Sequence, residues 1–181
     1  MNSVKIVLLL VLLNYRHNIR RRLCGPSLYL STLIIMKVRY SAHVDPDVKY
    51  PSQTFTNLLQ IYLADPDGWA GKGYDFEYDP KASLTIRLSS PRTIQKECGL
   101  PKGLSCAVLG GKKMWLNSDR WLKGASASQL SLDSYRQYMV SHEIGHILGH
   151  EHQKCPGKGM DAPIMLQQTL GLKGCRPNTR V

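Results

Sequence analysis

The stretch SHEIGHILGHEH, residues Ser141–His152, holds four of the six histidines in this chain of 181 residues. The segment before it offers Asp133 or Ser134 as a helix N-cap, and Gln137 completes a capping box if Ser134 is the cap. The histidine-rich stretch is therefore predicted to lie on a helix of about four turns.

The spacing of the first two histidines has chemical content. His142 and His146 are four residues apart, so both imidazoles project from the same face of a helix and can reach one metal ion. Glu143 is rotated by about 100° from His142, which puts its carboxylate beside the metal. There it can contact a metal-bound water as a general base.

A third ligand is needed, because two imidazoles leave a zinc ion incompletely held. The candidates are His150, Glu151, His152 and Asp161. Gly149 is predicted to end the helix in a left-handed C-cap, after which His152 swings back toward the ion while His150 points elsewhere. This reading gives the pattern H-E-x-x-H-x-x-G-x-x-H and favours His152, with Asp161 as the competing ligand.

A methionine follows the histidine pattern at a spacing that is compatible with a turn beneath the metal site. The short HExxH pattern also occurs by chance on helices with structural histidine pairs, whereas the extended pattern is far more specific. Met165 lies thirteen residues beyond His152, in the segment APIMLQQ. A lone methionine in an apolar run is usually part of a core, but together with the extended pattern it predicts a Met-turn beneath the metal.

The rest of the chain predicts an α+β sheet domain. Apolar and polar residues alternate over 37–45, which is typical of a half-buried strand, and helical spacing follows over 52–64 with Ser52 as N-cap. Further strands are predicted at residues 74–78 and 83–89, and a hairpin at 104–109 and 112–117 around a Gly-Gly turn.

Five cysteines occur, at positions 24, 98, 106, 155 and 175. The four in the body allow three pairings, of which Cys98–Cys106 and Cys155–Cys175 close the shortest loops. Free buried thiols or metal ligation are the alternatives, although no CxxC spacing supports metal binding. We favour two disulfides and an oxidising compartment, hence a secreted or extracytoplasmic protein.

Residues 1–36 are predicted to be an N-terminal appendage that precedes the domain. They carry five basic residues and no acidic one, with an apolar run from Ile6 to Leu13. This resembles a signal peptide but lacks a small-x-small cleavage site. A second apolar run follows at residues 27–36, and neither run is long enough to span a bilayer. The segment is thus an imperfect signal, a membrane anchor or an upstream extension of a protein that starts at Met36.

The formal charge of +11 does not indicate nucleic-acid binding. Outside the appendage the basic residues are scattered rather than gathered in a run with interleaved aromatics, which is typical of a solvated surface. The three tryptophans, Trp69, Trp115 and Trp121, are interpreted as core or cleft-wall residues rather than a stacking platform. We expect a monomer without a nucleic-acid partner.

HEIGHILGHEH (142–152) followed by PIM (163–165) resembles the metzincin zinc endopeptidases. Residues 135–178 resemble more closely a group of predicted secreted metzincin-like proteins of actinobacteria, whose domain is catalogued as of unknown function. The likeness reaches back through residues 105–121 to about Lys37 and covers about four fifths of the chain.

The resemblance implies a metzincin-like zincin fold over residues 37–181. Its upper part, 37–149, would hold a twisted, mostly parallel sheet with an antiparallel edge strand, a backing helix and the active-site helix. A small irregular lower part, 150–181, would face it across a cleft. The edge strand, at about 104–109, would pair with extended substrate.

The resemblance also implies one catalytic Zn²⁺ held by His142, His146 and His152, with Glu143 as base, and the disulfides Cys98–Cys106 and Cys155–Cys175. Some metzincins carry a tyrosine two residues after the methionine, where this chain has Gln167.

The function predicted from these features is a zinc-dependent metalloendopeptidase that hydrolyses peptide bonds through a Glu-assisted, zinc-bound water. The alternative is a catalytically silent, zinc-stabilised module that binds a protein or a cell-wall polymer. In that case a fourth protein ligand would close the site.

Overall fold

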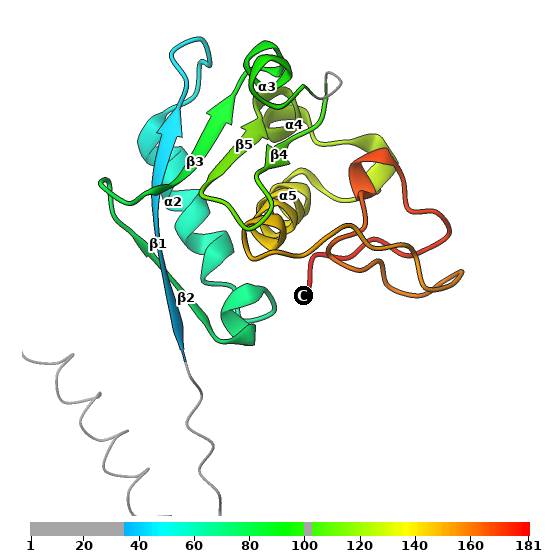
Figure 1. Ribbon diagram of the computed structural model, residues 1–181. Helices are drawn as coiled ribbons and strands as arrows, with labels where there is room; N and C mark the ends of the chain where they lie inside the picture. The colour runs from blue at the N-terminus through cyan, green and yellow to red at the C-terminus, as the bar shows by residue number, and fades with distance from the viewer. Residues whose placement is uncertain (1–34, 100–102) are drawn as a thin grey trace, which may run out of the picture. The chain divides into compact units, whose positions relative to one another are not determined.

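The computed structural model describes residues 35–99 and 103–181 (Figure 1). The predictions for the appendage concern residues outside this range, apart from Ile35 and Met36. Strands form where apolar and polar residues alternate, because successive side chains in a strand point to opposite faces. The strands are β1 (Met36–Val44), β2 (Tyr74–Tyr78), β3 (Leu84–Ser89), β4 (Cys106–Ala107) and β5 (Lys113–Asn117).

These strands form one sheet in the order β2-β1-β3-β5-β4. All neighbours are parallel except β4, which runs antiparallel to β5 at the edge of the sheet. The first half of β1 pairs with β2 and its second half with β3, with Tyr40 in register with both. The predicted edge strand at 104–109 is therefore present, but its ladder is limited to Cys106 and Ala107.

The helices are α2 (Ser52–Leu63), α3 (Pro91–Cys98), α4 (Ser118–Lys123) and α5 (Leu132–Ile147), with short 3₁₀ turns η2 (Trp69–Lys72), η3 (Ser126–Ser128) and η4 (Gln168–Leu170). Helices α2 and α5 cover the same face of the sheet (Figure 1). Their buried side chains and those of β1, β3 and β5 make one apolar core, in which Trp121 of α4 is fully buried.

The predicted N-caps are wrong at both long helices. Helix α2 has Pro51 at its N-cap and begins at Ser52. Helix α5 is capped by Ser131, whose hydroxyl accepts the backbone N–H of Ser134. Asp133 lies inside the first turn of α5, where its carboxylate accepts the hydroxyl of Tyr62 on α2 at 2.5 Å.

Two short helices were not predicted. Helix α3 begins after Ser90, whose hydroxyl accepts the N–H of Thr93, and has proline at its first position. Helix α4 is capped by Asn117, whose side chain accepts the N–H groups of Asp119 and Arg120. Both helices are shorter than three turns, so apolar periodicity gives little signal and only the caps mark them.

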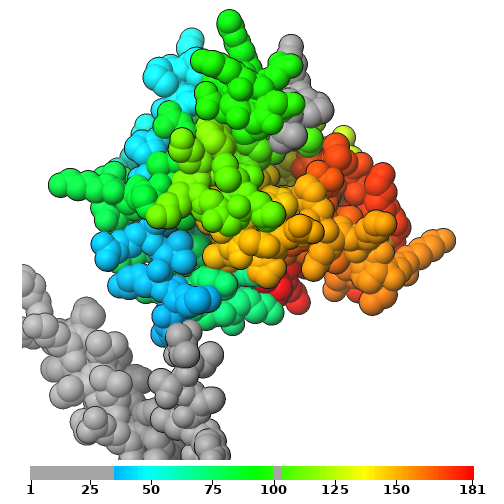
Figure 2. All heavy atoms as spheres, viewed as in Figure 1, coloured from blue at the N-terminus to red at the C-terminus, as the bar shows by residue number. Residues whose placement is uncertain are grey.

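After Gly149 the chain forms a lower part whose described residues contain η4 but no strand of the sheet. A small second cluster of buried side chains holds it together, made by Ala162, Leu166, Leu172 and Cys175. Cys155 and Cys175 are bonded, with Cα atoms 5.8 Å apart, and so are Cys98 and Cys106, at 6.7 Å. Figure 2 shows this segment, orange to red, beside the yellow-green β4–β5 edge of the sheet.

The predicted fold class is confirmed. The domain has a mostly parallel sheet with an antiparallel edge strand, the backing helix α2, the helix α5 that carries the histidines, and an irregular C-terminal part. Within the described ranges, no helix is long and apolar enough to cross a membrane.

The disulfide of the lower part generates a stability prediction. Cys155 and Cys175 close a loop with a sequence separation of 20 residues, for which loss of chain entropy in the unfolded state stabilises the fold by about 3 kcal/mol. We expect the double variant Cys155→Ala/Cys175→Ala to lose about this much in urea unfolding without reductant. The matched variant Cys98→Ala/Cys106→Ala opens a shorter loop and should lose less; the reverse order would contradict the entropic account.

Candidate active site

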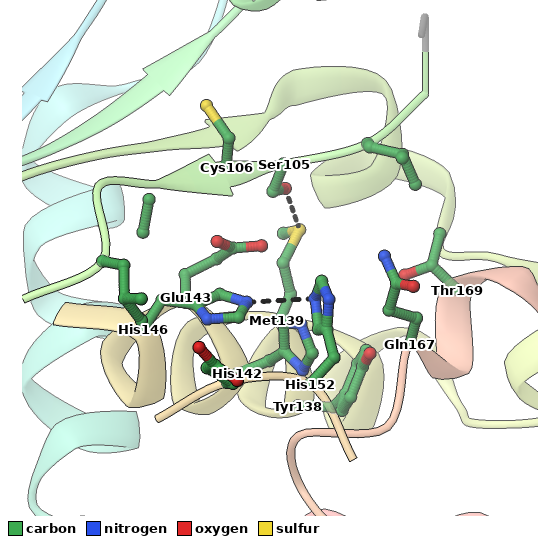
Figure 3. Close-up of a pocket in the computed structure, with 14 residues that line it drawn as sticks. Ser105, Cys106, Tyr138, Met139, His142, Glu143, His146, His152, Gln167 and Thr169 are labelled. Atoms are coloured by element: carbon green, nitrogen blue, oxygen red, sulfur yellow. Dashed lines mark hydrogen bonds between the residues drawn. The ribbon is translucent and has the colours of Figure 1, made fainter. Parts of the chain in front are cut away.

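Helix α5 and the segment after it bring three histidines together. One ring nitrogen from each of His142, His146 and His152 lies within 4.8 Å of the other two. The Nε2 atoms of His146 and His152 are 3.1 Å apart (Figure 3). Tetrahedral zinc, with Zn–N bonds of about 2.0–2.1 Å, separates two ligand nitrogens by about 3.3 Å. The spacing of this pair therefore suits a zinc ion.

The chain reversal at Gly149 makes this geometry. Helix α5 ends at Ile147, and Gly149 has a φ of 92°, in the left-handed region that favours glycine. The N–H of Gly149 donates to the carbonyl of His146 and that of His150 to the carbonyl of Gly145, which is a Schellman motif. The turn sends the chain back across the helix, so that His152 faces His146.

Backbone carbonyls orient two of the imidazoles. The Nδ1 atom of His142 lies 2.8 Å from the carbonyl oxygen of Ile164, and that of His146 lies 2.8 Å from the carbonyl oxygen of His150. A carbonyl can only accept, so each Nδ1 carries the proton and each Nε2 presents its lone pair. Sequence reasoning missed both partners, because a carbonyl is common to every residue and gives no signal in a sequence.

Burial favours the neutral form that a metal ligand needs. It lowers the pKa of His142 to about 4. It also lowers the pKa of His152, with a further lowering from the neighbouring His146. Since only a neutral imidazole offers a lone pair, these environments suit metal ligation.

Glu143 stands beside the histidines with a carboxylate that is not satisfied by protein. The residue is 5% exposed, and its Oε2 atom has no hydrogen-bond partner within the described residues. Burial raises the pKa of the Glu143 carboxyl to about 8. In Figure 3 the carboxylate lies between the imidazoles and β4. A buried carboxylate without a partner is costly, and a cation or proton donor in front of it removes that cost, so these residues fit a bound zinc ion.

These groups open into a cleft of about 480 Å³ between β4 and the lower part. Ser105, Cys106 and Ala107 line one side, and Gln167 and Thr169 the other (Figure 3). Gln167, two residues after Met165, therefore presents its side-chain amide to the cleft.

The other three candidate ligands, Asp161, His150 and Glu151, lie outside the histidine cluster. Asp161 is exposed, accepts from the guanidinium of Arg176 at 2.8 Å and lies outside the histidine cluster, so the geometry favours His152 over Asp161 as the third ligand. The ring of His150 stacks on Trp69, away from the histidine cluster. Glu151 is exposed and lines the cleft.

Met165 lies beneath the histidine helix. It is 2% exposed and packs against Gly145, where any β-carbon would overlap the methionine sulfur. The carbonyl of the preceding residue, Ile164, is the one that orients His142. The segment predicted as a Met-turn thus touches both the backbone of α5 and one candidate ligand.

Comparison with known proteins assigns the family. The sequence profile of a family described as "Protein of unknown function (DUF3152)" matches residues 32–176. The chain belongs to this family. No curated protein matches the sequence.

Several solved structures are similar to this DUF3152 chain. Myroilysin shares 13% identity over 64% of the chain, with a TM-score of 0.38. Archaemetzincin from Methanopyrus kandleri shares 14% over 83%, with a TM-score of 0.46, and is itself covered to 92%. The hatching enzyme HCE-1, a zinc-protease from the medaka fish Oryzias latipes, shares 14% over 71%, with a TM-score of 0.35 and 55% of its own chain covered. The chain spans about half, 49%, of the myroilysin chain.

The pKa shifts of Glu143 and His142 predict the pH dependence of stability in the metal-free protein. Folding raises the pKa of Glu143 from 4.5 to about 8, so its contribution to stability is lost as the pH rises through that window. Folding lowers the pKa of His142 from 6.5 to about 4, so its contribution is lost as the pH falls through that window. The two slopes oppose each other between pH 4.5 and 6.5, and only the Glu143 slope remains from 6.5 to 8.

We expect chelator-treated wild type to lose up to about 1.4 kcal/mol of unfolding free energy per pH unit above the His142 window. The Glu143→Gln variant, which has no carboxyl to titrate, should be flat there. Urea unfolding at a series of pH values measures both. A wild-type curve as flat as that of the variant would contradict the assignment of the buried carboxyl as the cause.

Proposed function

We propose that this chain is a zinc-dependent endopeptidase that hydrolyses peptide bonds. The observation that carries the proposal is the placement of the three-histidine cluster and the buried, unpartnered carboxylate of Glu143 in one cleft. A structural zinc site is closed by four protein ligands and has no need of a base beside it, whereas a catalytic one keeps a position open.

His142, His146 and His152 would hold the ion, which supplies Lewis-acid polarisation of the substrate carbonyl and acidification of water. Glu143 accepts a proton from the water whose oxygen bonds to the carbonyl carbon. It then donates that proton to the amide nitrogen as the C–N bond breaks, which releases a carboxylic acid and an amine. The burial of Glu143 excludes competing water from its carboxylate.

The substrate is proposed to be a peptide in extended conformation. Within residues 35–99 and 103–181, strand β4 is the last strand of the sheet and pairs only with β5, and both of its residues line the cleft. Its other edge is available to an added strand, which an extended peptide supplies through main-chain hydrogen bonds.

Two disulfides are typical of an oxidising compartment, so we also propose that the protein acts outside the cytoplasm. The silent zinc-stabilised module is less well supported. Of the residues that would close the site in that case, Asp161 is paired with Arg176 and the His150 ring is stacked on Trp69. Glu151 lines the cleft but lies outside the cluster of ring nitrogens.

The base is tested with Glu143→Gln, which keeps the shape of the side chain. We expect cleavage of unfolded casein to fall by about 100-fold to 10,000-fold, since a general acid–base contributes that much, while bound zinc stays at the wild-type level. Asp161→Asn, an exposed acidic residue outside the cleft, is the control and should cleave normally. Unchanged cleavage by Glu143→Gln would overturn the proposed mechanism.

The third ligand is tested by zinc affinity alone. His152→Ala should weaken zinc binding by more than about 100-fold, because even the outer partners of metal ligands contribute about 10–100-fold. Asp161→Ala should leave the affinity unchanged. Competition with a chromophoric chelator measures both variants, and the opposite result would make Asp161 the ligand.

A further inference from the structure

Trp69 lies against the metal-binding end of α5, although it comes from η2, 72 residues before the residue to which it bonds. Trp69 is 7% exposed, and its Nε1–H donates to the carbonyl of Ser141 at 2.8 Å, next to His142. The indole therefore touches the helix at the level of the first histidine.

A second contact joins the same indole to the helix one turn later. A β-carbon on Gly145 would lie 3.1 Å from Cζ2 of Trp69 and would overlap the sulfur of Met165. The absence of a side chain at Gly145 lets the indole pack directly on the helix backbone. Trp69 is thus held in a fixed position relative to α5 by a hydrogen bond and by close packing.

The exposed loop after the helix rests on this indole. The ring of His150 stacks on Trp69 with centroids 4.7 Å apart and an angle of 24° between the planes. The carbonyl oxygen of the same residue accepts from Nδ1 of His146 at 2.8 Å. The residue whose ring is stacked is therefore the residue whose carbonyl orients a candidate zinc ligand.

His146 depends on this contact more than His142 does. The carbonyl that orients His142 belongs to Ile164, which is 6% exposed and part of the core. His150 is exposed and follows Gly149, whose backbone is the least restrained of any residue. The Schellman turn sets the path of the backbone at His150, and the stack on Trp69 adds a contact that holds its side chain.

We propose that Trp69 and His150 form a positioning pair that sets the orientation of the His146 imidazole through the His150 carbonyl. The pair touches neither substrate nor metal, and it acts on the zinc affinity and on the ligand field. The inference rests on the proposed function only in taking His146 as a metal ligand.

The test uses His150→Ala, which removes the stacked ring but keeps the carbonyl, and His150→Phe, which restores a stacked ring. Because His150 is exposed, both variants should fold. Lys154→Ala, an exposed residue of the same loop, is the matched control. The readouts are zinc affinity by chelator competition, the visible absorption of the Co²⁺-substituted protein, and the thermal midpoint of the metal-free protein.

We expect His150→Ala to bind zinc about tenfold more weakly, in the range found for outer partners of metal ligands, and to shift the cobalt bands. His150→Phe and Lys154→Ala should match the wild type, and the metal-free midpoint should be the same in all four proteins. Wild-type zinc affinity in His150→Ala, or an equal loss in His150→Phe, would overturn the proposal.

These measurements need no substrate, so the two proposals fail separately. If Glu143→Gln still cleaves casein, the peptidase mechanism fails while the zinc affinities of the His150 variants still decide the positioning pair. If Glu143→Gln is inactive but His150→Ala binds zinc normally, the positioning pair alone fails.

Discussion

The left-handed turn at Gly149 is the constraint on which the site depends. A helix that continued past Ile147 would carry His150 along its own face and would take His152 away from His146. Because α5 ends there, both nitrogens of the His146 ring have a partner from the following segment. Its Nδ1 lies 2.8 Å from the carbonyl oxygen of His150, and its Nε2 lies 3.1 Å from Nε2 of His152. A β-carbon at this position would be strained by the backbone conformation even though there is space for it.

The lower part has little regular structure, so the helix must hold it in place. The hydroxyl of Tyr138 on α5 donates to the carbonyl of Leu166 and accepts the N–H of Gln168, which fixes the chain just after Met165. The hydroxyls of Tyr135 and Thr169 lie 2.9 Å apart and make a second connection. Two tyrosines, one and two turns before His142, thus tie the far wall of the cleft to the helix that carries two of the three clustered histidines.

The strands, the two long helices and the histidine pattern could be predicted from the sequence, because each rests on a periodic spacing of side chains. The short helices α3 and α4 are too short to show such a period. The N-cap of α5 is Ser131 rather than Asp133 or Ser134, because several neighbouring polar residues can cap a helix and their order alone does not choose among them. The carbonyl partners of His142 and His146 were out of reach for another reason. They depend on where the backbone passes in three dimensions. Trp69 is a further example, because it bonds to a residue that is 72 positions away in the sequence.

The buried polar groups distinguish a site from an ordinary core. Among the described residues, four buried side-chain atoms have no partner: Tyr40 Oη, Ser89 Oγ, Trp121 Nε1 and Glu143 Oε2. The first three belong to groups that are neutral near pH 7, and burial raises the pKa of Tyr40 further, to about 12.

An unsatisfied hydroxyl or indole costs a few kcal/mol at most, whereas a carboxylate must either bind a proton or face a positive charge. Of these four, Glu143 alone has this requirement, and it lies one residue from His142 on the helix that carries two of the three clustered histidines. Replacement by an apolar residue of similar volume would remove this cost, so Glu143 is the one described residue of the four whose burial fold stability alone does not explain.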